Sequence, residues 1–197
     1  MITYQMMEKE LSSIFNTLAL SESELNLIAK NFVKINFKKG DIVLRSNEEV
    51  KYQYYILEGC LRTFFIDKKG KEHTMQFAIN DWWISDYIGY FSATKSVLTI
   101  ECIENATLLR VTKEAVEKTY DSIPKIERFF RKKMERAFVS FQRRILSNLS
   151  QSAKERYINF TETYPNIEQH VKNYHIASYL GITTESLSRI RKEILSK

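Results

Sequence analysis

Residues 174–191 read YHIASYLGITTESLSRIR, and this segment predicts two helices joined by a tight turn. Gly181 follows the first apolar stretch and can take the positive φ that ends a helix. Thr183 is a suitable N-cap for the second helix. Leu187 and Ile190 are three residues apart, so both would face the first helix. This spacing is typical of a DNA-binding helix-turn-helix.

The second helix of such a motif fits the major groove, and its first two turns carry the outward residues. Arginine can bind guanine through two hydrogen bonds, glutamate can accept from the cytosine amino group, and lysine or threonine can bind phosphates. The predicted DNA-binding residues are Thr183, Thr184, Glu185, Ser188, Arg189 and Lys172. We interpret His170 and His175, which flank the motif, as solvated or adjacent to a phosphate. A purely structural helical hairpin is the alternative.

A long helix is predicted before this motif, because no glycine lies between Gly89 and Gly181 and apolar residues recur at helical spacing. Pro124 suits its first turn. Roughly 24 residues at about 1.5 Å each give about 36 Å. A helix of that length with a narrow apolar stripe usually pairs with another helix, although the stripe could also pack on the chain's own strands. The predicted dimer interface comprises Phe130, Met134, Ala137, Phe141 and Ile145.

The first half of the chain alternates between short β-rich runs and turns. The predicted strands lie at 35–38, 42–44, 54–57, 60–66, 73–79, 97–103 and 107–111. Asp67-Lys68-Lys69-Gly70 is a hairpin turn between two of them. Short strands at even spacing predict an antiparallel sandwich or barrel. Two short amphipathic helices, at 5–19 and 21–34, are expected before it.

The net charge of +6 is unevenly distributed. Residues 1–112 carry −1, residues 113–149 carry +5 and residues 150–197 carry +2. A polyanion is therefore a plausible partner for the C-terminal part, although a solvated basic helix face would give the same charges. We predict an α+β chain in three parts with these boundaries: a β-roll sensor domain, a connecting and dimerisation helix, and a helix-turn-helix domain.

Composition excludes several classes of protein. Hydrophobic residues make up 44% and charged residues 27%, as in ordinary globular chains. No apolar run approaches the roughly 18–20 residues needed to cross a bilayer, and the N-terminus has no secretory pattern. We expect a cytoplasmic protein with no membrane partner. Cys60 and Cys102 are too few for a metal–thiolate cluster and are expected to be reduced and buried; a thiol switch between them stays open.

Catalytic motifs are missing from the sequence. It contains no nucleophile elbow, no paired zinc histidines and no phosphate loop. Three histidines offer little acid–base chemistry. We therefore predict no catalytic residues, no metal site and no enzymatic activity.

The order of β-roll, long helix and terminal helix-turn-helix resembles the Crp/Fnr family of bacterial transcription regulators over nearly the whole chain. The matching pieces are Lys39-Gly40-Asp41, Glu58-Gly59, Asp67 to Gly70, and residues 180–189. The resemblance implies a jelly-roll-type β-roll (a double-stranded β-helix), a winged helix-turn-helix-like domain, and a homodimer joined along the long helix. It further implies a two-fold symmetric site on double-stranded DNA, with RNA polymerase as an additional candidate partner.

Within this resemblance, Glu185 and Arg189 match the family's base-contacting Glu and Arg. Thr184 stands where many members have a further Arg, so a different DNA sequence is expected. The function predicted is a sequence-specific transcription regulator. The alternative is a cyclic-nucleotide-type module that docks on another protein through its terminal helices.

Nucleotide-binding members of the resembled family carry Gly-Glu and then Arg-Ser/Thr about ten residues later. Here Ser85-Asp86 replaces Gly-Glu, and Lys95-Ser96 is nearest to Arg-Ser. Aspartate is one carbon shorter than glutamate, and lysine cannot clamp a phosphate bidentately. We predict that the roll does not bind cAMP; another small-molecule effector, or none, stays open. The candidate effector pocket comprises Trp83, Ser85, Asp86, Lys95 and Ser96.

Overall fold

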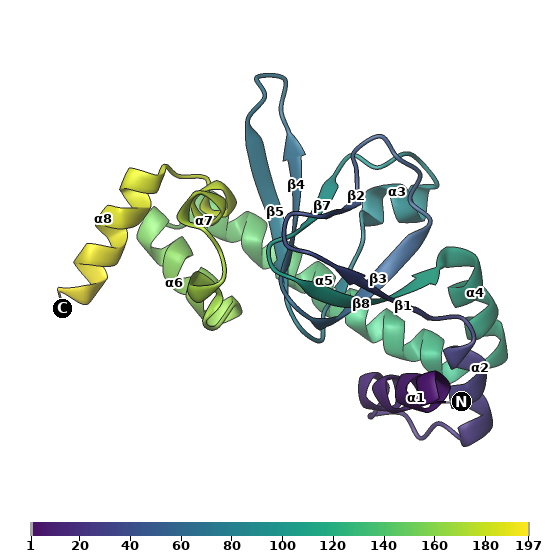
Figure 1. Ribbon diagram of the computed structural model, residues 1–197. Coiled ribbons are helices and arrows are strands. Elements are labelled where there is room, and N and C mark those ends of the chain that lie inside the picture. Colours follow the sequence, from purple (N-terminus) through teal and green to yellow (C-terminus); the bar gives the residue numbers. More distant parts are fainter. Residues whose placement is uncertain (1, 197) are drawn as a thin grey trace.

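The computed structural model describes residues 2–196 and places a β-roll between two groups of helices, with one long helix running beneath it (Figure 1). The N-terminal helices are α1 (Ile2–Ile14) and α2 (Glu22–Ala29). The roll contains β1 (Val33–Phe37), β2 (Ile42–Leu44), β3 (Tyr52–Glu58), β4 (Leu61–Ile66), β5 (Glu72–Ala78), β6 (Trp83–Ile84), α3 (Tyr87–Ser92), β7 (Thr99–Cys102) and β8 (Ala106–Thr112). The remaining helices are α4 (Lys113–Ser122), α5 (Pro124–Ser150), α6 (Ala153–Thr163), a 3-10 turn (Ile167–Gln169), α7 (Asn173–Leu180) and α8 (Thr184–Leu195).

The roll is built from two four-stranded antiparallel sheets. Their strand orders are β1-β8-β3-β6 and β2-β7-β4-β5. Buried side chains from both sheets, such as Ile56, Leu61 and Ile100, share one apolar cluster between them. The α+β class and the antiparallel β-roll predicted from the sequence are confirmed.

Turn chemistry sets the connections of the roll. Gly70 takes a φ of 80° between β4 and β5, and Gly59 takes a φ of 108° between β3 and β4. A Cβ atom on Gly59 would approach the Asn105 carbonyl oxygen to 2.6 Å. Only glycine fits at position 59, because the positive φ and the lack of space both exclude a side chain.

Helices α1, α2 and α4 pack with the start of α5 on the outer face of the β1-β8-β3 sheet. Leu11, Phe15, Ile28 and Phe130 are buried together there. Ser21 begins α2 with the predicted capping box, whose partner is Glu24. α2 is shorter than predicted, because the chain already enters β1 at Val33.

Helix α5 extends over 27 residues and has Pro124 in its first turn. Its first part belongs to the N-terminal cluster, where Phe130 is 7% exposed. The Phe130 ring lies 4.7 Å from the Trp83 ring and 5.6 Å from the Phe129 ring. The prediction that Phe130 forms a dimer interface is therefore wrong, because the seam of α5 starts inside the chain's own core.

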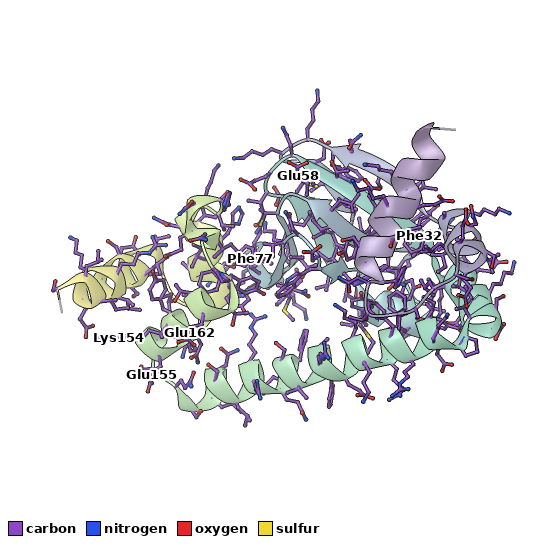
Figure 2. The ribbon with its side chains drawn as sticks, turned by 90° about the horizontal axis from the view of Figure 1, so that it is seen from below. Phe32, Glu58, Phe77, Lys154, Glu155 and Glu162 are labelled. Carbon is purple, nitrogen blue, oxygen red and sulfur yellow. The ribbon has the colours of Figure 1, made fainter. Side chains whose placement is uncertain are left out.

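The C-terminal helices form a separate apolar cluster that touches the roll through Phe77 (Figure 2). The Phe77 ring contacts Phe160, Tyr164 and Tyr179 at centroid distances of 6.0, 5.9 and 5.5 Å. Between residues 150 and 196 the structure contains helices and no strand, so the winged form implied by the resemblance is not found in this part of the chain.

Candidate functional site

Helices α7 and α8 form the predicted helix–turn–helix. α7 ends at Gly181, which takes a φ of 67°. The Ile182 amide donates to the Ala177 carbonyl across the turn at 3.0 Å. Thr183 then caps α8, because its hydroxyl accepts from the Ser186 amide at 3.2 Å. The turn residues thus act as the sequence predicted.

The two helices hold together through small and apolar side chains. Ile176, Ala177 and Leu180 of α7 and Leu187 and Ile190 of α8 are all buried. Ala177 is small enough to let α8 approach closely. Leu187 and Ile190 therefore face α7, as their spacing of three residues predicted.

The opposite side of the motif is exposed. All six residues predicted to bind DNA are solvent-exposed: Thr183, Thr184, Glu185, Ser188, Arg189 and Lys172. The Arg189 guanidinium donates to the Ser186 hydroxyl at 3.2 Å. A hydrogen bond with its own backbone amide and further ones with Thr183 and Thr184 lower the pKa of Glu185, which keeps this carboxylate ionised. The role of these six residues in DNA binding stays a prediction.

Arg191 of α8 faces inward and was not singled out from the sequence. Its guanidinium forms an ion pair with Glu168 and donates to the Asn173 side chain at 2.7 Å. It also lies over the Tyr157 ring, 5.8 Å from its centroid. Arg191 thus fixes α8 to α6 and to the start of α7. Its place directly after Ile190 on α8 gave no sign of this role, because all three partners come from other elements.

The motif is fastened to the roll along strand β5. The Thr74 amide donates to the Ser178 hydroxyl at 2.9 Å, and that hydroxyl donates to the Glu72 carbonyl at 3.0 Å. Arg144 of α5 stacks on the Tyr179 ring at 4.0 Å and donates to the Met75 carbonyl. A movement of the roll would therefore be passed directly to α7.

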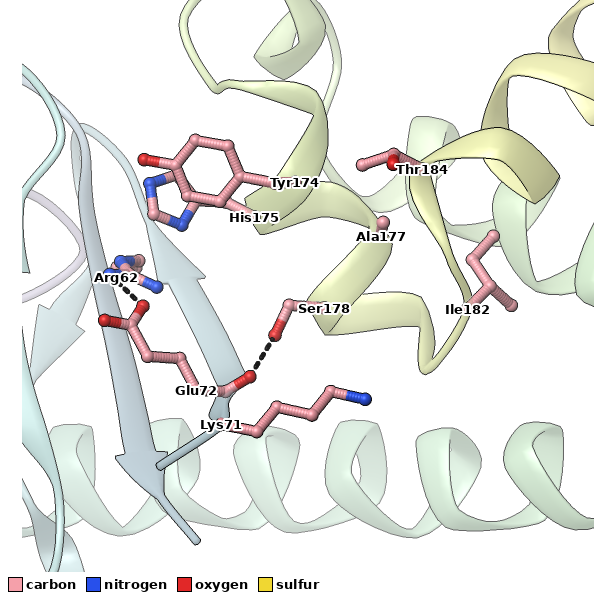
Figure 3. A pocket seen from close by; sticks show the side chains of 9 residues that line it. All are labelled: Arg62, Lys71, Glu72, Tyr174, His175, Ala177, Ser178, Ile182 and Thr184. Atoms are coloured by element: carbon pink, nitrogen blue, oxygen red, sulfur yellow. Dashed lines mark hydrogen bonds and ion pairs between the residues drawn. The ribbon is translucent and has the colours of Figure 1, made fainter. Parts of the chain in front are cut away.

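A pocket of about 170 Å³ lies at this junction (Figure 3). Arg62, 3% exposed, forms its floor with ion pairs to Glu72 at 2.7 Å and Glu101 at 2.6 Å. His175 is 4% exposed, so its interpretation as solvated is wrong. Burial, together with the charges of Arg62 and Lys172, lowers the pKa of His175 to about 4 and keeps its ring neutral at pH 7. The ring is buried because α7 packs on β5 with this face inward.

Asp86 dominates the segment in which an effector was expected. It is fully buried and caps α3, accepting from the Ile88 and Gly89 amides at 3.0 and 3.3 Å. Its second oxygen accepts from the Ser96 hydroxyl at 2.7 Å and from the Val97 and Leu98 amides at 2.7 and 3.0 Å. Burial opposes its ionisation, but these hydrogen bonds outweigh it and lower the pKa of Asp86.

The predicted effector residues are only partly brought together. Asp86 and Ser96 touch, whereas Lys95 is exposed and is not one of the donors to the Asp86 carboxylate. Ser85 is buried and donates to the Tyr52 carbonyl at 2.8 Å. Placing Trp83 in this pocket was wrong: its ring packs 5.2 Å from Tyr55 in the N-terminal cluster. Five donors that could hold an anion are already directed at the Asp86 carboxylate.

Cys60 and Cys102 are both free and buried. Burial raises the pKa of each thiol to about 12, so little thiolate forms at neutral pH. Within residues 2–196, no group of three or more His, Cys, Asp or Glu side chains is arranged to hold a metal ion. No helix in the same range is long and apolar enough to span a bilayer.

The second half of α5 leaves its apolar residues uncovered. Phe141 is 48% exposed and Ile145 55%, and Met134 and Ala137 lie on the same stretch. The exposed apolar residues of this half-helix are Phe138, Val139, Phe141, Ile145, Leu146 and Leu149. All of these except Leu149 border a groove of about 1520 Å³ between α5, α6 and the roll. Exposed apolar area of this extent on one helix is typical of an interaction surface.

Comparison with known proteins agrees with this architecture. Residues 34–122 match the cyclic nucleotide-binding domain family. The chain is 24% identical over 188 residues to the regulatory protein HlyX of Actinobacillus pleuropneumoniae, covering 87% of this chain and 75% of that protein. The chain is thus similar in sequence to a regulatory protein over most of its length, and its residues 34–122 match the cyclic nucleotide-binding domain model.

Two solved structures show the shared fold. FixK2 from Bradyrhizobium japonicum superposes with a TM-score of 0.73 at 17% identity, over 84% of this chain and 85% of that one. A structure described as a Crp/Fnr-family regulator from Eubacterium rectale gives 0.68 at 19% identity, over 93% and 86%. The fold that the Crp/Fnr resemblance implied is confirmed.

Proposed function

We propose that this chain is a homodimeric, sequence-specific DNA-binding regulator of transcription in the cytoplasm, without enzymatic activity. The observation that carries the proposal is the side of α8 that faces solvent. A capped helix presents Glu185, Ser188 and Arg189 outward, while Leu187 and Ile190 anchor its other side. A helix so presented has the width and the donors that major-groove recognition requires.

The uncovered half of α5 supports a dimer. A second α5 packed on Phe141, Ile145 and their neighbours would remove this apolar surface from water. Two copies related by a two-fold axis would then present two α8 helices, which suits a two-fold symmetric DNA site. Met134 and Ala137 belong to this proposed interface, whereas Phe130 does not. RNA polymerase is a further proposed partner, by analogy with the family.

We also propose that the roll works without cAMP. The backbone amides and the Ser96 hydroxyl that could cradle an anion donate to Asp86 instead. A cyclic phosphate would have to displace a buried carboxylate that already satisfies these donors. Calorimetric titration should therefore give no binding of cAMP at micromolar concentrations, and a micromolar dissociation constant would contradict this part of the proposal.

The DNA-binding proposal is tested on a site selected from random duplexes with the purified chain. Arg189→Ala should weaken binding to the selected site by about 1–3 kcal/mol, the range for one good base contact, and should leave binding to unrelated duplex nearly unchanged. Lys30→Ala is the control, because Lys30 is an exposed cation at the end of α2, outside the helix–turn–helix. An equal loss on both duplexes would reject the base-contacting role.

The competing function is a regulatory module that docks on another protein. The +7 net charge of residues 113–197 favours a polyanion over a protein surface of mixed charge. Failure of the wild-type chain to enrich any duplex at low salt would favour the docking module instead.

A further inference from the structure

The hairpin between β4 and β5 projects from the roll beside α7 and the start of α8 (Figure 1). Its tip carries three lysines, Lys68, Lys69 and Lys71, and all three are exposed. None of them forms an ion pair with another residue in the range 2–196. The tip is thus a group of available cations next to the proposed recognition helix.

The base of this hairpin is fixed to the helix–turn–helix. Ser178 of α7 bonds to the Thr74 amide and the Glu72 carbonyl, at 2.9 and 3.0 Å. Lys71 and Thr184 line the same pocket, and Figure 3 shows Lys71 extending toward the turn between α7 and α8. The hairpin and the first turn of α8 therefore keep a defined position relative to each other.

The tip itself is held rigidly by Asp67. One oxygen of its carboxylate accepts from the Lys69 and Lys71 amides at 2.8 and 3.0 Å, and the other lies 2.8 Å from His73. The Gly70 amide donates to the Asp67 carbonyl at 2.9 Å. Because the backbone is already ordered, the lysines would lose little backbone entropy on binding a ligand.

The cations continue from the hairpin onto the motif. Lys172, at the start of α7, is exposed and lies over the Tyr174 ring, 5.8 Å from its centroid. Tyr174 lines the junction pocket together with Lys71 and Thr184. Lys71 and the Tyr174 ring under Lys172 therefore border the same pocket as Thr184, at the start of α8. A polyanion bound at the start of α8 would be close to these lysines.

We propose that the β4–β5 hairpin is a second DNA-binding element, whose lysines contact the phosphates of duplex flanking the sequence bound by α8. This inference rests on the proposed DNA-binding function and adds a contact made by the sensor domain. Lysine–phosphate contacts hold position and affinity but distinguish no bases. Because the hairpin belongs to the roll, a shift of the roll would change affinity as well as the position of α8.

The test replaces all three tip lysines in the full chain, as K68Q/K69Q/K71Q, and measures binding to the selected site across a salt series. Removing one lysine–phosphate interaction should reduce the slope of log K against log salt by about 0.9, so the slope of the triple variant should be smaller by up to about 2.7 per subunit, or about 5.4 for the dimer. Affinity at about 0.1 M salt should fall between roughly tenfold and a few hundredfold, equally on selected and unrelated duplex.

The matched control is K9Q/K30Q/K95Q, which removes the same charge from exposed lysines on α1, after α2 and after α3. Long-range attraction alone would lower both triple variants equally, and that result would overturn the proposal. An unchanged salt slope in K68Q/K69Q/K71Q would also overturn it, while normal binding by the wild type would leave the proposed function intact. Shortening the duplex to the α8 site alone should abolish the difference between wild type and hairpin variant.

Discussion

Asp86→Asn tests whether the buried carboxylate organises the roll. Asparagine has nearly the shape of aspartate, but one of its two oxygens becomes an amide that donates. In one orientation the amide faces Ser96, Val97 and Leu98; in the flipped orientation it faces the Ile88 and Gly89 amides. Either way, at least two N–H groups that donate to the buried carboxylate lose their acceptor.

These two unsatisfied donors set the expected loss of stability. A buried donor left without an acceptor costs about 1–3 kcal/mol, so two of them give roughly 3 kcal/mol of lost unfolding free energy. With a urea m-value of about 2 kcal/mol/M, the midpoint should fall by about 1.5 M. Asp121→Asn is the control, since Asp121 is exposed, and it should move the midpoint little.

The pH dependence gives an independent check. Because the pKa of Asp86 is lower in the folded chain than its unfolded value of about 3.9, the carboxylate stabilises the fold above that pH. This contribution disappears as the pH falls through the folded pKa. The gap between wild type and Asp86→Asn should therefore be constant from about pH 5 to 8 and shrink below about pH 4. A variant as stable as the Asp121→Asn control at pH 7 would refute the reasoning.

Two further perturbations separate the parts of the chain. Phe141→Glu should give folded monomers with weak DNA binding, and light scattering measures the mass; an unchanged mass would contradict the proposed dimer interface. Phe130→Ala should instead cost about 3–5 kcal/mol of unfolding free energy, measured by urea unfolding, because it empties a core site. His175 stays neutral when folded and has a lowered pKa of about 4, against about 6.5 unfolded, so stability should fall by about 2 kcal/mol from pH 7 to pH 5. His175→Gln should flatten that fall, and an unaltered pH profile would show that another group causes it.

The elements with strong local signals were predictable from the sequence. Gly181, Thr183 and the Ser21–Glu24 capping box act locally, through backbone conformation or hydrogen bonds to near neighbours, so neighbouring residues suffice to identify them. The apolar stripe of α5 was equally clear. Its periodicity could not show where packing on the chain's own core ends, because Phe130 and Phe141 occupy the same helical side and differ only in what lies opposite.

The effector segment was harder for a different reason. Asp86 was interpreted as a shortened ligand-binding glutamate, whereas it caps a six-residue helix, α3, that is too short to show helical periodicity. Strand β6 has only two residues, Trp83 and Ile84, and escaped detection likewise. The Asp86 cap of α3 is held by residues 96–98, and β6 pairs with β3. Patterns in a single sequence do not reveal such long-range partners.

The internal carboxylate and the fastened hairpin together constrain how this chain could respond to a signal. Asp86 satisfies the donors of α3 from within, so those donors are not available to sense a small anion. The roll nevertheless remains joined to α7 through Ser178 and to α5 through Arg144. A signal acting on β4 or β5 would reach the proposed DNA-binding surface through these few hydrogen bonds. Ser178→Ala should therefore weaken the coupling between hairpin and motif, and the salt slope should fall toward that of the hairpin variant while the monomer–dimer equilibrium stays unchanged.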